Sequence, residues 1–177
     1  GVVADLALLK TAHLARSARL DALTGLPLRH GLEEECERLR AQARRHGERM
    51  VALMLDLDGF KEINDAEGHA AGDLALRHVA ALLRQQCRAG EPVFRFGGEE
   101  FLALLQAADR AAAERAAERI LQTLRASPLV LPDGRTLAVR ASAGMAEVGD
   151  LEPVTETLVR EAVRKSSRAA RGRTEQR

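Results

Sequence analysis

Hydrophobic positions along this chain alternate between strand-like runs and helix-like stripes. Residues 51–58 are almost entirely apolar before their acidic residues, which is typical of a strand covered on both faces. Two shorter apolar runs, 93–96 and 101–105, predict the strands of a hairpin. Residues 132–134 are expected to form a turn between short strands, and residues 136–148 to supply a further strand.

Between these runs, apolar residues recur at helical spacing. Three amphipathic helices are predicted, and a further helix is expected to start near Pro153. The predicted inward faces carry Leu32, Cys36, Leu39 and Ala43, then Leu76, Val79 and Leu83, then Ala113, Ala117, Ile120, Leu121 and Leu124. Helices and strands that alternate in this way predict an α/β domain.

The N-terminal residues follow a different pattern. Residues 2–22 lack proline and internal glycine and are predicted to form a helix. Spacings of four and three residues alternate through Val2, Leu6, Leu9, His13, Arg16, Leu20 and Leu23. This is the a/d seam of a short coiled coil with two polar positions in its middle. The helix either caps the domain or ends a signalling stalk that pairs two protomers. We therefore divide the chain into residues 1–22 and 23–177 and expect a sensor domain upstream.

Composition narrows the range of partners and locations. The 177 residues suffice for one domain with its own core. Lysine and arginine (27) nearly balance aspartate and glutamate (26), and four phenylalanines are the only aromatic residues, so neither a nucleic-acid nor a membrane partner is expected. No apolar run reaches the roughly 18 residues of a membrane span. Cys36 and Cys87 belong to no C-x-x-C pair, so we expect two free thiols in the cytoplasm.

Candidate chemistry is concentrated in the stretch Phe94-Arg95-Phe96-Gly97-Gly98-Glu99-Glu100-Phe101. The two glycines are expected to form a tight hairpin turn with positive φ. The two glutamates would then lie at the sheet edge, where a metal ion and a polyphosphate can approach the backbone. The same pattern also fits an ordinary hairpin with a solvated acidic turn.

A second stretch favours the first of these interpretations. It reads Asp56-Leu57-Asp58-Gly59-Phe60-Lys61-Glu62-Ile63-Asn64-Asp65 and runs on to Gly68-His69 and Gly72-Asp73. A third, Asp21-Ala22-Leu23-Thr24-Gly25-Leu26-Pro27, precedes both. With these motifs in this order, the chain resembles the GGDEF family, the diguanylate cyclases, over residues 21–173. Its signature is the GGEEF variant.

This resemblance implies a fold and an activity. GGDEF domains have a central, mostly antiparallel sheet wrapped by helices, similar to the palm of nucleotidyl cyclases and polymerases. They are nucleotidyltransferases that condense two GTP into cyclic di-GMP and two pyrophosphates. Each protomer holds one GTP and the two sites face each other, so a homodimer is implied. One alternative is a degenerate module that binds GTP or cyclic di-GMP without catalysis, and another is a pure dimerisation module.

A metal site is implied by the same resemblance. Asp56, the carbonyl of Leu57 and Glu99 are the implied ligands of two Mg²⁺ ions, with Mn²⁺ as an alternative. Adjacent strands would bring Asp56 and Glu99 together. Asp58 shares a face with Asp56 by the period of a strand, and it either takes part in catalysis or orients the backbone. Glu100, with Glu99, is the implied base for the attacking 3′-hydroxyl.

Substrate contacts are implied for residues after the first acidic motif. Backbone N–H groups of Gly59 and Phe60 would contact the β- and γ-phosphates, and Lys61 would neutralise developing charge. Guanine would be read by Asn64 and Asp73, since a carboxylate accepts hydrogen bonds from its N1–H and N2–H₂ groups. The family pattern also places His69, Gly97, Gly98 and Arg173 at the substrate. The histidine fits a packing role equally well.

Four features depart from the family pattern. Leu28 stands where an asparagine is usual, and Ala169 stands where a phosphate-binding lysine is usual, for which a neighbouring arginine could substitute. The family's final short strand is not evident. The inhibitory R-x-x-D motif becomes Arg88-Ala89-Gly90-Glu91, so Arg88 and Glu91 are a candidate product-inhibition site.

Overall fold

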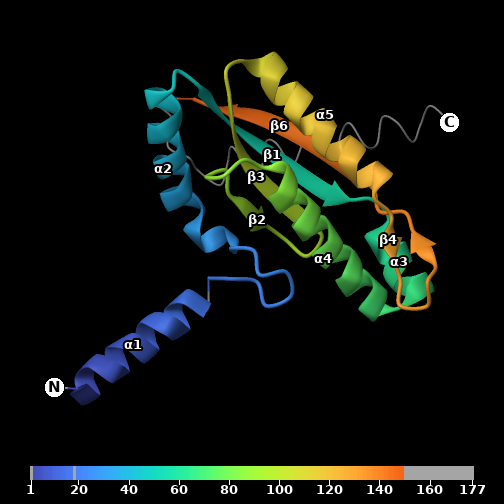
Figure 1. The fold of residues 1–177 in the computed structure, drawn as a ribbon, viewed down its shortest axis with the longest axis horizontal. Helices are drawn as coiled ribbons and strands as arrows, with labels where there is room; N and C mark the ends of the chain where they lie inside the picture. Colours follow the sequence, from blue (N-terminus) through green and yellow to red (C-terminus); the bar gives the residue numbers. More distant parts are fainter. Residues whose placement is uncertain (1, 18, 150–177) are drawn as a thin grey trace.

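The computed structural model describes residues 2–17 and 19–149 of the chain. Its centre is a four-stranded sheet in the order β2-β3-β1-β6, in which each strand runs antiparallel to its neighbour (Figure 1). The strands are β1 (Arg49–Leu57), β2 (Val93–Arg95), β3 (Glu100–Ala107) and β6 (Ala141–Val148). The predicted antiparallel central sheet is confirmed.

Helices surround this sheet and alternate with its strands along the chain. They are α2 (Leu32–Arg45), α3 (Phe60–Glu67), α4 (His69–Gln86) and α5 (Arg110–Ala126), and a 3₁₀ turn, η1 (Arg29–Gly31), precedes α2. Helix α1 (Val2–Ser17) extends away from the sheet at the N-terminal end (Figure 1). This arrangement confirms the α/β class. The helix predicted near Pro153 lies outside the described residues.

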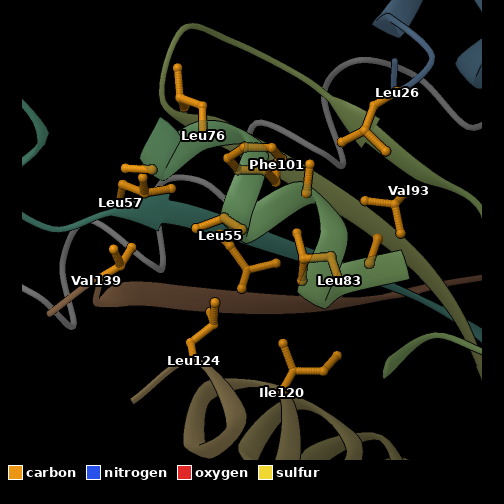
Figure 2. Packing of buried hydrophobic residues seen from close by; sticks show 14 of the residues in the cluster. Leu26, Leu55, Leu57, Leu76, Leu83, Val93, Phe101, Ile120, Leu124 and Val139 are labelled. Carbon is orange, nitrogen blue, oxygen red and sulfur yellow. The ribbon is translucent and has the colours of Figure 1, made fainter. Parts of the chain in front are cut away.

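The central strand β1 is buried on both faces and so builds two cores. Leu55 and Leu57 pack toward α4 and α5 (Figure 2), whereas Met50 and Met54 pack toward α2. Fully burying one such side chain contributes about 1.5–3 kcal/mol. The predicted inward residues of α2, α4 and α5 are buried, except that Ala117 and Leu121 of α5 are only partly so. The apolar run at 51–58 therefore reflects a doubly covered strand, as predicted.

The first helix is shorter than predicted, because it ends at Ser17 rather than at residue 22. The chain then turns back on itself, and Leu20 forms an isolated β-bridge with Pro27. Leu6 and Leu9 of the predicted seam are exposed on α1. None of the helices in the described part of the chain is long and apolar enough to cross a membrane.

The strand predicted over 136–148 is also broken in the structure. Strand β5 (Thr136–Leu137) pairs with β4 (Leu129–Val130) in a separate two-stranded sheet, whereas β6 pairs with β1. The two segments therefore belong to different sheets, and the chain changes direction between them. The turn at 132–134 joins β4 to β5, as predicted.

Candidate functional site

The sheet brings three acidic residues together at the end of β1. Asp56 pairs with Glu100 on β3 and with Ser142 on β6. The backbone N–H of Leu57 donates to the carbonyl oxygen of Glu99 at 3.1 Å, which holds Glu99 beside the same strand end. Residues more than 40 positions apart are thus neighbours, as the pairing of central strands predicted.

Asp56 is electrostatically unusual. Its Oδ1 atom is buried and has no hydrogen-bond partner among the described residues. Burial, with the negative charges of Glu99, Glu100 and Asp58, raises the pKa of Asp56 to about 6. A buried carboxylate oxygen among like charges is costly unless a cation or proton compensates it. These oxygens therefore fit a hard divalent cation.

A metal ion here would need ligands besides carboxylates. Within residues 2–17 and 19–149, no group of three or more His, Cys, Asp or Glu side chains forms a ready metal cage. The implied set of Asp56, Glu99 and the carbonyl of Leu57 contains only two side chains. Substrate oxygens and water would have to complete the coordination, as is usual for Mg²⁺ at a polyphosphate.

Asp58 links the end of β1 to β6. Its backbone N–H donates to the carbonyl of Arg140 at 2.9 Å, and its Oδ1 accepts from the hydroxyl of Ser142 at 2.7 Å. Because Ser142 is also the strand partner of Asp56, Asp58 and Asp56 lie on one face of the sheet, as predicted. These contacts tie Asp58 to β6 beside the end of β1.

The hairpin turn differs from the prediction, because neither Gly97 nor Gly98 has positive φ. At Gly97, glycine leaves space rather than conformational freedom: a Cβ atom there would overlap Oε1 of Glu100, so that the end of this side chain would have to shift. Phe96 and Gly97 both donate their backbone N–H groups to the carbonyl of Glu100, at 2.9 and 3.2 Å. The glycine thus leaves room for the acidic side chain that follows it.

Arg95 holds this turn in place, and its role was not predicted from the sequence. Its guanidinium donates to the carbonyls of Gly97 and Gly98 at 3.3 and 2.7 Å and to Oδ2 of Asp21 at 2.9 Å. The side chains of Arg95 and Asp21 are only 15% and 16% exposed. Burial alone would raise the pKa of Asp21, but hydrogen bonds from Thr24 and Arg95 outweigh burial and lower it. The sequence offered one indication of this contact: Asp21 and Arg95 each belong to one of the quoted motifs.

The α3–α4 corner gathers the predicted base-reading residues. The side chain of Asn64 lies against Gly72, where a Cβ atom would overlap its Oδ1. Asp73 follows Gly72 in α4 and is exposed. His69 is the first residue of α4 and is exposed rather than packed. The corner therefore has polar groups accessible to a ligand.

The loop from β1 into α3 carries the other predicted substrate contacts. Gly59 adopts a left-handed conformation with φ of +66° and leads directly into Phe60, the first residue of α3. This conformation suits glycine. Lys61 is exposed and lies 3.4 Å from Asp65, one helical turn further on. Arg173 and Ala169 lie outside the described residues.

The candidate inhibitory residues lie beside a separate cavity of about 250 Å³. Both carboxylate oxygens of Glu91 accept backbone N–H groups, from Arg88 at 2.8 Å and from Gln106 at 2.9 Å. The lining also includes Arg115 and Arg119 of α5. The motif therefore stabilises its own loop and borders a hollow lined by these three arginines and by Glu48 and Glu91, of which Glu48 lies 3.7 Å from Arg88.

Comparison with known proteins shows which proteins are similar to this chain. The sequence pattern described as "Diguanylate cyclase, GGDEF domain" matches residues 18–176. The chain is 41% identical to the diguanylate cyclase TpbB of Pseudomonas aeruginosa over 138 residues, which are 77% of this chain and 32% of TpbB. It thus spans about a third of the length of that relative.

Two solved structures show the same fold. The GGDEF domain of TpbB from Pseudomonas aeruginosa superimposes with a TM-score of 0.78 at 36% identity, covering 86% of this chain and 89% of that one. The coiled coil and GGDEF domain of DgcB from Caulobacter crescentus, in complex with c-di-GMP, gives a TM-score of 0.82 at 26% identity, covering 97% and 91%.

Proposed function

Because this chain belongs to the GGDEF family of diguanylate cyclases, we propose that it condenses two GTP into cyclic di-GMP and two pyrophosphates. The observation that carries the proposal is the buried Oδ1 of Asp56, which has no partner among the described residues and lies in an acidic cluster. An ordinary hairpin with a solvated acidic turn gives no reason to bury such a group. A site for a cation and a polyphosphate does.

The acidic residues would hold the metal and move the proton. We propose that Asp56, the carbonyl of Leu57 and Glu99 bind Mg²⁺, or alternatively Mn²⁺. Two such ions, when bound, would neutralise the triphosphate and the departing pyrophosphate. Glu100, beside Gly97, is proposed to accept the proton of the 3′-hydroxyl, with help from Glu99.

The loop and helices beyond β1 would bind the nucleotide. Backbone N–H groups of Gly59 and Phe60 are proposed to contact the β- and γ-phosphates, and Lys61 to add positive charge. Asn64 and Asp73, at the α3–α4 corner, are proposed to read guanine. Because adenine would leave the carboxylate unpaired, GTP should bind better than ATP. The further proposed substrate contacts are His69, Gly97, Gly98 and Arg173.

The reaction requires two copies of the chain. Each protomer would bind one GTP, and each 3′-hydroxyl would attack the α-phosphorus of the nucleotide on the partner. Helix α1 is proposed to pair the protomers through its exposed leucines and to carry a signal from an upstream sensor to this domain, which would lie in the cytoplasm.

Product formation tests the proposal directly. The purified chain is incubated with GTP and Mg²⁺ at several protein concentrations, and cyclic di-GMP is measured by chromatography and mass spectrometry. The rate should rise faster than linearly with protein and vanish in Glu99→Gln. Glu114→Gln, on the surface of α5, is the matched control and should keep wild-type activity. If GTP binds with Mg²⁺ but no product forms at any protein concentration, the chain is a degenerate GGDEF module that binds nucleotide without catalysis, and the cyclase proposal is wrong.

The cavity beside Arg88 supports a second proposal, that the product binds there and inhibits. Arg88, Arg115 and Arg119 give this cavity three guanidinium groups suited to phosphate. Glu91 already binds two backbone N–H groups, so we expect the arginines to provide most of the affinity. Arg88→Ala should weaken inhibition by added cyclic di-GMP, and unchanged inhibition would exclude the site.

A further inference from the structure

Helix α3 carries three of the residues proposed to bind GTP, Phe60, Lys61 and Asn64, yet the core holds it only weakly. None of its eight residues is buried. It packs mainly against α4, its neighbour in sequence. So short a helix is not stable by itself. Its position must therefore depend on a few specific contacts.

One such contact ties the end of α3 to the β4–β5 hairpin. The Nη1 and Nη2 atoms of Arg135 donate to Oε1 and Oε2 of Glu67 at 3.2 and 2.9 Å. This is a bidentate pair between residues that are 68 positions apart. Glu67 is the last residue of α3, and its side chain is 23% exposed. A long-range connection of this kind can fix the C-terminal end of the helix, which the single residue Gly68 joins to α4.

Arg135 is held in place within its own turn before it reaches α3. Its Nε donates to Oδ2 of Asp133 at 2.7 Å, and its backbone N–H donates to Oδ1 of the same carboxylate at 3.0 Å. These hydrogen bonds lower the pKa of Asp133, and those to Glu67 and Asp133 raise the pKa of Arg135. The guanidinium is therefore preorganised, so less side-chain entropy is lost when it binds Glu67.

The charge of Glu67 explains why this partner matters. A carboxylate in the last turn of a helix faces the negative end of the helix dipole and is unfavourable there. Arg135 compensates that charge. Simple exposed ion pairs contribute little to stability, but bidentate pairs within a network are the exception.

We propose that Arg135 is a positioning residue for nucleotide binding. Through Glu67 it clamps the β4–β5 hairpin to α3 and so sets where this helix presents Asn64 and Lys61. Asn64 and Glu67 are three residues apart and share one face of α3, so the clamp acts on the face that places Asn64 against Gly72. The inference rests on the proposed function for the identity of the nucleotide. Arg135 itself need not touch GTP.

Binding measurements on single and double variants test the clamp. Calorimetry with Mg²⁺ and guanosine 5′-[α,β-methylene]triphosphate, which cannot react at the α-phosphorus, gives the affinity without turnover. We expect Arg135→Ala and Glu67→Ala each to weaken binding by about three- to tenfold, the range for a bidentate pair in a network. The double variant should bind the analogue no more weakly than the weaker-binding single variant, since the two substitutions remove the same interaction. Arg135→Lys, which keeps the charge without the fork, should lie between wild type and Arg135→Ala.

A control variant and a second readout separate positioning from general destabilisation. Arg110→Ala removes an exposed ion pair with Glu114 on α5 and should leave the affinity unchanged. Without nucleotide, amide hydrogen exchange over residues 60–67 should be faster in Arg135→Ala, while exchange in β1 stays at the wild-type rate.

The outcomes distinguish the clamp from the proposed function. If the wild type binds the analogue and Arg135→Ala binds it equally well, or if the effects of the two single variants add, the inference is overturned. If the wild type does not bind the analogue, the proposed function fails and the role in nucleotide binding fails with it. Unchanged exchange over residues 60–67 would overturn the clamp whatever the nucleotide result.

Discussion

Asp56 lowers the stability of the folded protein but suits a cation-binding site. Its neighbours along β1 are apolar and buried, whereas its own Oδ1 is buried without a partner among the described residues. The folded state therefore disfavours the charged form, and the pKa rises from the ordinary value of 3.8 to about 6. Such a group destabilises the metal-free protein and becomes favourable when a cation binds.

Replacing this carboxylate should therefore stabilise the metal-free protein. Between about pH 4 and pH 6, the folded chain holds a proton that the unfolded chain has released, so the free energy of unfolding falls as pH rises through this interval and stays low above it. We expect Asp56→Asn to raise the Tm at pH 7 by about 2–4 °C, which is about 1 kcal/mol after allowance for solvent screening. The gain should disappear below about pH 4.

Scanning calorimetry in EDTA at several pH values measures this difference. Asp5→Asn, on the exposed surface of α1, is the control and should show no such dependence on pH. A lower Tm for Asp56→Asn at pH 7 would show that the carboxylate is stabilised by groups other than a metal, and would contradict the prediction.

The α3–α4 corner shows how closely two elements can approach around a functional side chain. Gly72 lies inside α4 with ordinary helical backbone, so the reason for glycine is space rather than conformation. The space is filled by the amide of Asn64 from α3. The corner thus combines a packing requirement with the proposed reading of guanine.

Gly72→Ala should separate these two roles. The new Cβ would overlap the Asn64 side chain, which must rotate away, while alanine favours a helix interior by about 1 kcal/mol over glycine. We expect the Tm to change little and the affinity for GTP to fall about tenfold, the loss of roughly one hydrogen bond to the base. Gly31→Ala, where a Cβ meets no atom within 4 Å, is the control. An unchanged affinity for GTP in Gly72→Ala would show that Asn64 does not bind the nucleotide.

Sequence patterns predicted the elements whose positions are set by burial. The apolar run of β1 and the stripe of α2 report directly on which side chains leave water. The pairing of β1 with β3 then places Asp56 opposite Glu100 and brings Glu99 to the backbone of Leu57. The helix end at Ser17 was not predictable in this way. The loop that includes Asp21 is held by an ion pair with Arg95, 74 residues away, and a contact of this kind leaves no periodic pattern in the sequence.

The hairpin turn illustrates the same limit. A glycine pair between two strands suggested positive φ, but neither glycine has it, and Gly97 instead leaves room for the end of the Glu100 side chain. The Glu67–Arg135 pair joins two elements that have no shared motif. Contacts between polar side chains over long sequence separations leave no periodic signal, so the structure was needed to find them.

At the scale of the whole molecule, the proposed reaction depends on how two copies meet. Helix α1 extends from the domain (Figure 1) and exposes several large apolar side chains, among them Leu6 at 54%, Leu8 at 73% and Leu9 at 67%. Leu6 and Leu9 are three residues apart and share one face, whereas Leu8 points in another direction. Pairing through the seam of Leu6 and Leu9 would bury that face and bring two nucleotide sites together.

Charge placed on this seam should therefore make the activity depend more steeply on protein concentration. Leu6→Glu combined with Leu9→Glu places like charges opposite each other in a paired seam, so we expect the rate per protomer to fall at least about tenfold at low concentration. The loss should diminish as the concentration rises, because mass action restores the dimer while each site stays intact. Leu8→Glu adds a charge to the same helix outside the seam and should retain nearly wild-type rates. Equal losses in both proteins would mean that α1 acts through its charge or stability, and not by pairing protomers along this face.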